Sequence, residues 1–195
     1  MKPESSSGHL GDLAPGFLIA MPQLLDPNFN RTVVLLLKSN EEGALGLVIN
    51  RPTEMSLREF LKLESIQFDG DESLTVNLGG PVEQESHLLV LHGEPPVFDD
   101  DSEAEIELAP GLRLVMAMEG LRALAGRGTR RLRCYVGYAG WGPGQLEREL
   151  SNGAWIPLPC DASFIFDQAP NEIWGNALRR SGIDPISLVP GGAVN

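Results

Sequence analysis

Residues 137–150 read GYAGWGPGQLEREL, a glycine-rich stretch that runs directly into a charged one. Glycine adopts backbone conformations that other residues avoid, so its density in the first half of the stretch predicts a tight turn. The preceding segment, RLRCYVGYAG (131–140), has the β-branched and aromatic content of a strand. Leu146 and Leu150 are four residues apart and share one face of a helix. The stretch therefore predicts a strand that turns sharply into a helix, with Trp141 packed at the turn.

A glycine-rich turn before a helix can also cradle an anion, because free backbone N–H groups attract negative charge. The stretch has neither the G-K-[ST] ending of a P-loop nor a G-x-G-x-x-G pattern, and Glu147 and Glu149 add negative charge there. A structural turn is therefore favoured over a ligand cradle. Glu147 lies at the boundary of the buried helix face, where we expect it to accept hydrogen bonds from the turn; a general base is the alternative. Gln145 and Glu149 form a second pair at helical spacing.

Apolar runs alternate with turn residues along the rest of the chain. TVVLLLKS (32–39), whose apolar run is typical of a strand covered on both faces, is predicted to form an antiparallel hairpin with ALGLVIN (44–50). Residues 105–118 predict a second hairpin. Short helices are predicted after a Ser56–Glu59 capping box and at 118–128, 143–153 and 170–182.

Hairpins interleaved with short helices argue against a regular βαβ repeat. We therefore expect an α+β fold, in which short α-helices flank a mixed, largely antiparallel β-sheet. The 195 residues suit one domain, and no linker divides them, so residues 13–195 are predicted to be a single domain. Residues 1–12 are polar and are predicted to be a flexible N-terminal tail.

The chain is strongly acidic, with a formal charge of −12 and a sequence pI near 4.6. Such a chain repels the phosphate backbone, which argues against nucleic acid as a partner. Residues 94–108 carry seven acidic residues and no basic one. We expect a solvated loop there; a calcium site is the alternative, but the D-x-[DN]-x-[DN]-G spacing is missing.

The two cysteines, Cys134 and Cys160, form no CxxC motif and cannot build a zinc site alone. We expect no metal and no cofactor. The N-terminus lacks the apolar core of a signal peptide, and no apolar run reaches the length of a membrane span. These observations predict a cytoplasmic protein with free thiols and no membrane partner.

No nucleophile, base and acid are visibly assembled in the sequence. His87 and His92 are five residues apart on a predicted strand, so they point to opposite faces and cannot share a metal ion. Cys134 with His92 is the one candidate Cys–His pair, although strand cysteines usually behave as small hydrophobes.

Two polar turns end predicted strands, Asn50-Arg51-Pro52 and Gly79-Gly80-Pro81. Sites in mixed sheets often gather at strand ends, so these turns and Gly140–Gly144 can line one groove in which Arg51 supplies a cation. The alternative, which the residue types alone favour, is that the turns are structural and that Arg51 is solvated or pairs with Glu54.

Four segments together resemble the AlgH/YqgE family, also catalogued as UPF0301: residues 16–52, NLGGPVEQ (77–84), LHG (91–93) and GYAGWGPGQLEREL (137–150). The resemblance spans roughly residues 13 to 190. It implies a single α+β domain with a strongly curved mixed sheet flanked by helices, in a bacterial cytoplasmic protein. The family supplies no reaction; some members are labelled transcriptional regulators, without a recognised DNA-binding motif.

The positions that match the family's motifs define a candidate functional surface: Asn50, Arg51, Gly79, Gly80, Pro81, His92, Tyr138, Trp141, Gln145 and Glu147. The resemblance transfers no catalytic role to any of them. The chain departs from the family at VMAMEG (115–120), where small hydroxyl residues and an aspartate are common. It departs again at PGGAVN (190–195), where the family commonly ends near Gly-His-Ala.

We therefore predict a non-enzymatic binding or regulatory module whose partner is a protein or a small molecule. The alternative is an enzyme of unknown class, in which Glu147 or His92 acts as acid or base and Arg51 binds an anion. A third hypothesis is direct DNA binding, which needs a basic patch made of Arg122, Arg127, Arg130, Arg131 and Arg133.

Overall fold

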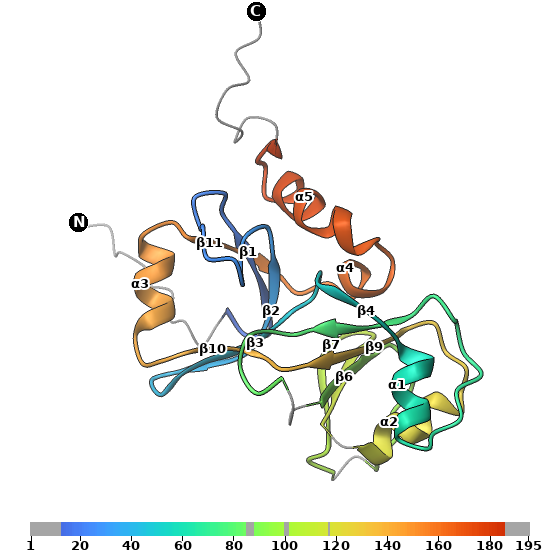
Figure 1. Cartoon of the computed structure of the whole chain (residues 1–195). Coiled ribbons are helices and arrows are strands. Elements are labelled where there is room, and N and C mark those ends of the chain that lie inside the picture. The colour runs from blue at the N-terminus through green and yellow to red at the C-terminus, as the bar shows by residue number, and fades with distance from the viewer. Residues whose placement is uncertain (1–12, 85–87, 100–101, 117, 186–195) are drawn as a thin grey trace, which may run out of the picture.

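The computed structural model describes residues 13–84, 88–99, 102–116 and 118–185 (Figure 1). The tail predicted at residues 1–12 lies outside the described residues, and so do His87 and the C-terminal PGGAVN.

The described strands form two sheets. Sheet A has the order β10 (Ala139–Trp141), β3 (Gly43–Val48), β2 (Val33–Asn40), β1 (Gly16–Ala20) and β11 (Trp155–Pro159), with antiparallel neighbours throughout. Sheet B has the order β4 (Pro52–Ser56), β5 (Thr75–Leu78), β9 (Leu132–Val136), β6 (Leu88–His92), β8 (Leu112–Val115) and β7 (Glu105–Ala109). In sheet B, β5 and β9 are parallel and the other neighbours are antiparallel. The α+β class with mixed, largely antiparallel strands is confirmed, and the strands expected in one sheet are divided between two.

Within the described residues, five short helices pack against the two sheets (Figure 1). They are α1 (Leu57–Leu63), α2 (Met118–Ala125), α3 (Gln145–Ser151), α4 (Ser163–Phe166) and α5 (Pro170–Arg180). Apolar residues of α1 and α2 pack on one face of sheet B, and those of α3 pack on one face of sheet A. The remaining helices, α4 and α5, contribute to the core that both sheets share.

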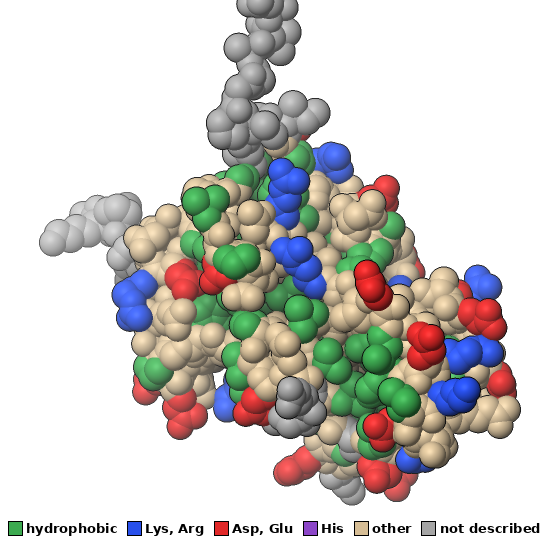
Figure 2. Space-filling model, viewed as in Figure 1, with side chains coloured by type: hydrophobic (Ala, Val, Ile, Leu, Met, Phe, Trp, Pro, Cys, Tyr) green, Lys and Arg blue, Asp and Glu red, His purple; other side chains and the backbone are tan. Residues whose placement is uncertain are grey.

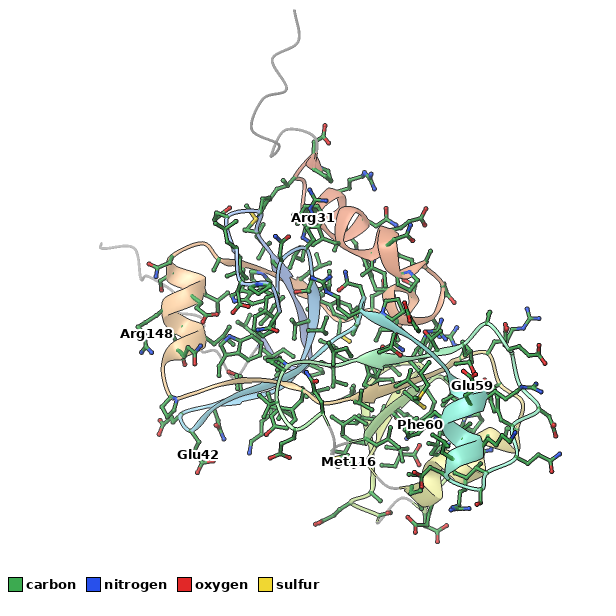
Figure 3. The ribbon with its side chains drawn as sticks, in the orientation of Figure 1. Arg31, Glu42, Glu59, Phe60, Met116 and Arg148 are labelled. Atoms are coloured by element: carbon green, nitrogen blue, oxygen red, sulfur yellow. The ribbon has the colours of Figure 1, made fainter. Side chains whose placement is uncertain are left out.

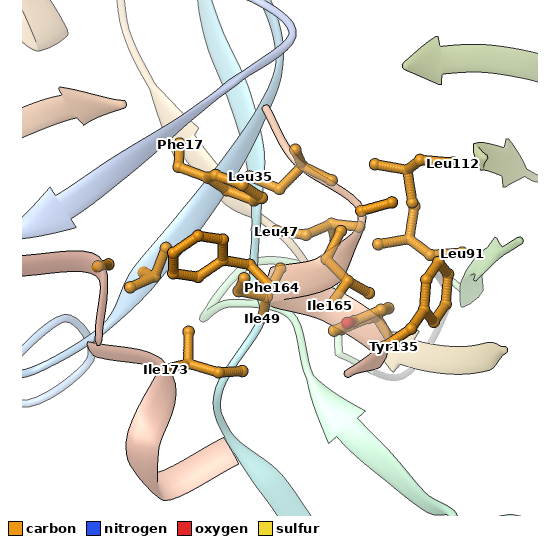
Figure 4. Packing of buried hydrophobic residues seen from close by; sticks show 14 of the residues in the cluster. Phe17, Leu35, Leu47, Ile49, Leu91, Leu112, Tyr135, Phe164, Ile165 and Ile173 are labelled. Carbon is orange, nitrogen blue, oxygen red and sulfur yellow. The ribbon is translucent and has the colours of Figure 1, made fainter. Parts of the chain in front are cut away.

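The shared core lies where the inner faces of the two sheets meet α4 and α5 (Figure 4). Strand β2 illustrates how the sequence builds it, because successive side chains of a strand point to opposite faces. Val33 and Leu35 face the shared core, whereas Val34 and Leu36 face the α3 side. All four are completely buried, which confirms the prediction of a strand covered on both faces.

The chain crosses from one sheet to the other beside the glycine-rich stretch. The single strand predicted at 131–140 is wrong: it is interrupted at Gly137, so that β9 belongs to sheet B and β10 to sheet A. Gly137 has φ +71°, and a Cβ there would lie 2.8 Å from the Gly80 and Val82 carbonyl oxygens. A residue with a side chain is disfavoured on both counts, so glycine permits the crossing.

Several local predictions are confirmed in detail. The hydroxyl of Ser56 accepts a hydrogen bond from the Glu59 N–H while the Glu59 carboxylate accepts one from the Ser56 N–H, which is the predicted capping box. The predicted hairpins 32–50 and 105–118 are β2–β3 and β7–β8. Strand β3 ends at Val48, and Pro52 begins β4, an edge strand of sheet B, where a residue without an N–H is tolerated.

Candidate functional site

A small hollow lies at the junction of the two sheets, where several strand ends meet. We call it the strand-end groove. Its volume is about 160 Å³, and its walls are formed by Pro27, Asn28, Val48, Arg51, Leu78, Gly80 and Pro81. Arg51 is the only charged residue among these seven. The groove thus brings together Arg51 with Gly80 and Pro81, three of the residues that the sequence nominated, and adds Pro27 and Asn28 from a turn that it did not nominate.

Asn50 and Arg51 fasten the end of β3 to the turn at residues 26–31. The Asn50 side chain accepts a hydrogen bond from the Val33 N–H and donates one to the Arg31 carbonyl, both at 3.0 Å. The Arg51 Nη2 donates to the Asn30 carbonyl at 2.5 Å. Asn50 therefore acts through the backbone and does not line the groove, whereas Arg51 is held at its wall.

The Arg51 guanidinium has no carboxylate partner in the described part of the chain. The pairing with Glu54, considered as an alternative from the sequence, is not present among the salt bridges of these residues. Arginine has five N–H donors, and a single hydrogen bond to Asn30 leaves most of them without an acceptor within these residues.

The Gly79-Gly80-Pro81 turn forms the wall next to the glycine-rich stretch. The Gly79 carbonyl accepts a hydrogen bond from the Val48 N–H at 2.7 Å, so the turn is attached to sheet A. A Cβ on Gly80 would lie 2.2 Å from the Tyr138 carbonyl carbon, and the backbone φ of Gly80 is +156°. Glycine at this position lets the two motifs run in direct backbone contact, which places Tyr138 behind the groove wall.

The other nominated residues of the stretch build a separate network beneath α3. The indole N–H groups of Trp141 and Trp155 both donate to one oxygen of the Glu149 carboxylate, at 2.9 and 2.7 Å. Gln145 donates to the other oxygen at 2.9 Å and accepts a hydrogen bond from the Gly142 N–H. The carboxylate that serves the turn is therefore that of Glu149. Glu147, which the sequence nominated for this role, makes no side-chain hydrogen bond within the described residues.

This network is structural in character. Trp141 and Trp155 are 5% and 3% exposed, and with Phe29 they form a cluster whose ring centroids lie 5.6–6.0 Å apart. The rings are in contact with one another and the carboxylate is already occupied by their N–H groups. The sequence carried one signal for Glu149, its spacing of four residues from Gln145, but the approach of Trp155 comes from a distant segment.

His92 lies elsewhere, at the end of β6, with its side chain completely buried. Its Nε2 is 3.1 Å from an oxygen of Glu105, although the two are not aligned as a hydrogen bond. Burial lowers the pKa of His92, against the opposing effect of the Glu105 carboxylate. Cys134 is also completely buried, and burial raises the pKa of its thiol to about 12. A thiol with such a pKa is not a nucleophile near neutral pH, so the Cys134–His92 pair is not supported.

The arginines of the DNA-binding hypothesis all have partners on the protein. Carbonyl oxygens accept hydrogen bonds from Arg122, Arg127 and Arg133, and carboxylates lie within 4.0 Å of Arg130 and Arg131.

Within the described residues, no three His, Cys, Asp or Glu side chains are grouped so that they could hold a metal ion. None of the described helices is both long and apolar enough to cross a membrane.

Comparisons with known proteins identify relatives over nearly the whole chain. The AlgH-like family model matches residues 17–186. A UPF0301 protein of Myxococcus xanthus is 40% identical over 185 residues, which cover 94% of this chain and 99% of that protein. A UPF0301 protein of Anaeromyxobacter sp. (strain K) is 39% identical, with 92% and 93% covered.

Two solved structures share the fold. The solution structure of the AlgH protein from Pseudomonas aeruginosa has 36% sequence identity and a TM-score of 0.71, with both chains covered completely. The crystal structure of a protein from Corynebacterium diphtheriae has 23% identity and a TM-score of 0.70, with 96% of this chain and 92% of that chain covered. At that identity the second match speaks for the fold alone.

Proposed function

This chain belongs to the AlgH-like family, and we propose that it is a non-enzymatic binding module whose ligand or partner contacts the strand-end groove. One observation carries the proposal: strand ends of both sheets and the turn at residues 26–31 converge on a single hollow whose only charge is Arg51. Ligand sites in mixed sheets are commonly built from such convergent ends.

The competing enzyme hypothesis needs an acid or base within hydrogen-bond reach of a substrate bound at Arg51. His92 pairs with Leu132 on β9, whereas Leu78 of the groove pairs with Val136. Those positions are four residues apart on one strand, or about 13 Å, and the His92 side chain has no exposed surface. Glu147 lies on α3 and does not line the groove. A binding role therefore has the stronger physical basis.

Some family members are labelled transcriptional regulators, and a binding module can have such an effect without contacting DNA itself. The formal charge of −12 and the engaged arginines argue against direct contact with DNA. We propose that any regulatory effect passes through the ligand or protein bound at the groove.

We also propose that the protein is cytoplasmic, because a reducing compartment suits the free thiols of Cys134 and Cys160.

The proposal is tested by a partner and ligand search carried out in parallel on three proteins: the native sequence, Arg51→Gln and Arg148→Gln. Arg148 is the matched control, since it is an exposed arginine on α3, away from the groove (Figure 3). Affinity purification from the source cell and thermal shifts against metabolites are expected to yield partners that Arg51→Gln loses and Arg148→Gln retains. Partners that survive both changes would contradict the proposal, and so would substrate turnover that Glu147→Gln abolishes.

A further inference from the structure

Arg51 is the one basic side chain that lines the strand-end groove. The protein has 27 acidic and 15 basic residues, yet only five of the basic side chains in the described part of the chain have a carboxylate nearby. Carboxylates lie within 4.0 Å of Arg58, Arg113, Arg130, Arg131 and Arg180. Arg51 is half-buried, lines a cavity and has no such neighbour among the described residues. Its positive charge is therefore uncompensated at the groove.

The guanidinium is also held in place before any ligand arrives. Its Nη2 donates a hydrogen bond to the Asn30 carbonyl at 2.5 Å, which restrains the position of the group. The Nε and Nη1 hydrogens and the second Nη2 hydrogen have no acceptor in the described part of the chain, so Nη2 can still form a parallel pair with one of its neighbours. A planar, pre-oriented guanidinium binds a carboxylate or phosphate through two parallel hydrogen bonds, and its orientation lowers the entropy lost on binding.

The charges near Arg51 are of both signs. Asp26, on the neighbouring turn, accepts the Asn28 N–H at 2.9 Å and does not pair with Arg51, and its negative charge opposes an anion at the groove. Arg31, on the same turn, stacks over the Trp174 ring at 5.6 Å and adds positive charge to this side of the molecule. Figure 2 shows basic side chains in a row in the upper half of the molecule, in the region where Figure 3 labels Arg31.

The other residues that line the groove are mostly apolar. Gly80, whose N–H has no acceptor among the described residues, lines it together with Val48, Leu78 and Pro81. A volume of about 160 Å³ is smaller than the roughly 300–1,000 Å³ that encloses a drug-sized ligand. Only a terminal group of a larger molecule, or a small ion, fits inside.

From these observations we propose that the strand-end groove binds a terminal carboxylate, or an oxyanion of similar size, against the Arg51 guanidinium. This inference rests on the proposed function, because it names the chemistry of the ligand for the same groove. Two sources share that chemistry: a small organic acid, and the free C-terminus of a partner polypeptide.

The test is an amide NMR titration of the full chain at constant ionic strength, with acetate, inorganic phosphate and acetamide as probes. Acetamide has the shape of acetate without its charge. Acetate is expected to shift the amide signals of Gly80 and Asn28 with a Kd of about 1–10 mM, the range open to a single small group. Acetamide is expected to leave them unchanged.

A matched pair of variants locates the binding without touching Arg51. Asn28→Asp is nearly isosteric and places a carboxylate on the groove wall, so acetate binding is expected to weaken at least tenfold. Asn171→Asp makes the same change at an exposed position of α5 that does not line the groove, and binding is expected to be retained. A short peptide with a free C-terminus, compared with its amidated form, distinguishes the two sources.

Three results would overturn the inference: no acetate or phosphate binding up to about 100 mM, equal shifts with acetamide, or binding that Asn28→Asp leaves intact. Its failure can be told apart from failure of the proposed function. A neutral or cationic partner that is lost in Arg51→Gln would refute the anion and leave the groove as the binding site. Partners that do not depend on Arg51 would refute the groove itself.

Discussion

Replacing Glu149 by alanine should destabilise the protein far more than the same replacement at Glu147, two residues earlier on α3. Glu149 accepts hydrogen bonds from the Trp141 and Trp155 indoles and from Gln145, whereas the Glu147 side chain makes none within the described residues. The two substitutions remove the same chemical group from the same helix. Their difference therefore isolates the hydrogen-bond network.

The magnitude follows from the two indole N–H groups, which belong to side chains that are 5% and 3% exposed. Each buried donor left without an acceptor costs about 1–3 kcal/mol. Glu149 itself is half-buried, so water can reach part of the vacated space, and we expect a net loss of about 2–4 kcal/mol for Glu149→Ala. In a chain of this size that corresponds to a fall in Tm of roughly 5–15 °C. Glu147→Ala should stay within about 0.5 kcal/mol.

Urea unfolding monitored by tryptophan fluorescence measures both variants, and near-UV circular dichroism reports whether the aromatic cluster stays ordered. Glu149→Gln retains one acceptor oxygen and is expected to fall between the native protein and Glu149→Ala. Equal losses for Glu147→Ala and Glu149→Ala would refute the reasoning, because the loss would then come from the helix and not from the indoles.

Three further predictions concern other parts of the fold. Burial lowers the pKa of His92, so the imidazole binds a proton more readily in the unfolded chain than in the native protein. The free energy of unfolding should therefore fall as the pH falls from 7.5 to 5.5. In urea titrations His92→Gln should make this pH dependence weaker. Hydrogen bonds from Ser163 lower the pKa of Asp161 to about 2. The ionised carboxylate therefore stabilises the native protein above its unfolded pKa, and this stabilisation is lost as the pH falls towards 2. The loss of unfolding free energy in Asp161→Asn, relative to the native protein, should be largest at pH 7 and should shrink between pH 5 and 2.5. Gly80→Ala puts a Cβ 2.2 Å from Tyr138 at positive φ and should lower the Tm measured by calorimetry by roughly 5 °C or more.

Each of these has a control or a contrary outcome. A pH slope in His92→Gln equal to that of the native protein would assign the proton uptake to another group. A deficit of Asp161→Asn that stays constant down to pH 2.5 would contradict the ionic origin of its effect. Gly153→Ala, also at positive φ but with no atom within 4 Å of the added Cβ, should cost less than Gly80→Ala.

Local patterns in the sequence predicted much of the fold. The Ser56–Glu59 capping box and the hairpins depend on neighbouring residues, and the structure contains them. The division into two sheets was not predictable in this way. The apolar run of residues 131–140 continues through Gly137, and only contacts with Gly80 and Val82, more than fifty residues away, reveal that the chain changes sheets there.

The candidate site was also predictable only in part, because some of its residues are placed by contacts between distant segments. Arg51, Gly80 and Pro81 were predictable as neighbours because turns at strand ends meet at sheet edges, whereas Asn28 lies on a turn whose position depends on the Asn50 hydrogen bonds. His92 was grouped with Arg51 from its place in a shared motif. The strand register separates the two, and register depends on pairing between distant segments that the motif does not encode.

Native mass spectrometry of the protein purified from its source cell tests the central claim most directly. The native sequence, Arg51→Gln and Arg148→Gln would be isolated under identical mild conditions and their masses compared. The groove hypothesis predicts a bound molecule or partner chain on the native protein and on Arg148→Gln that is absent from Arg51→Gln. The same bound species on all three proteins would contradict it.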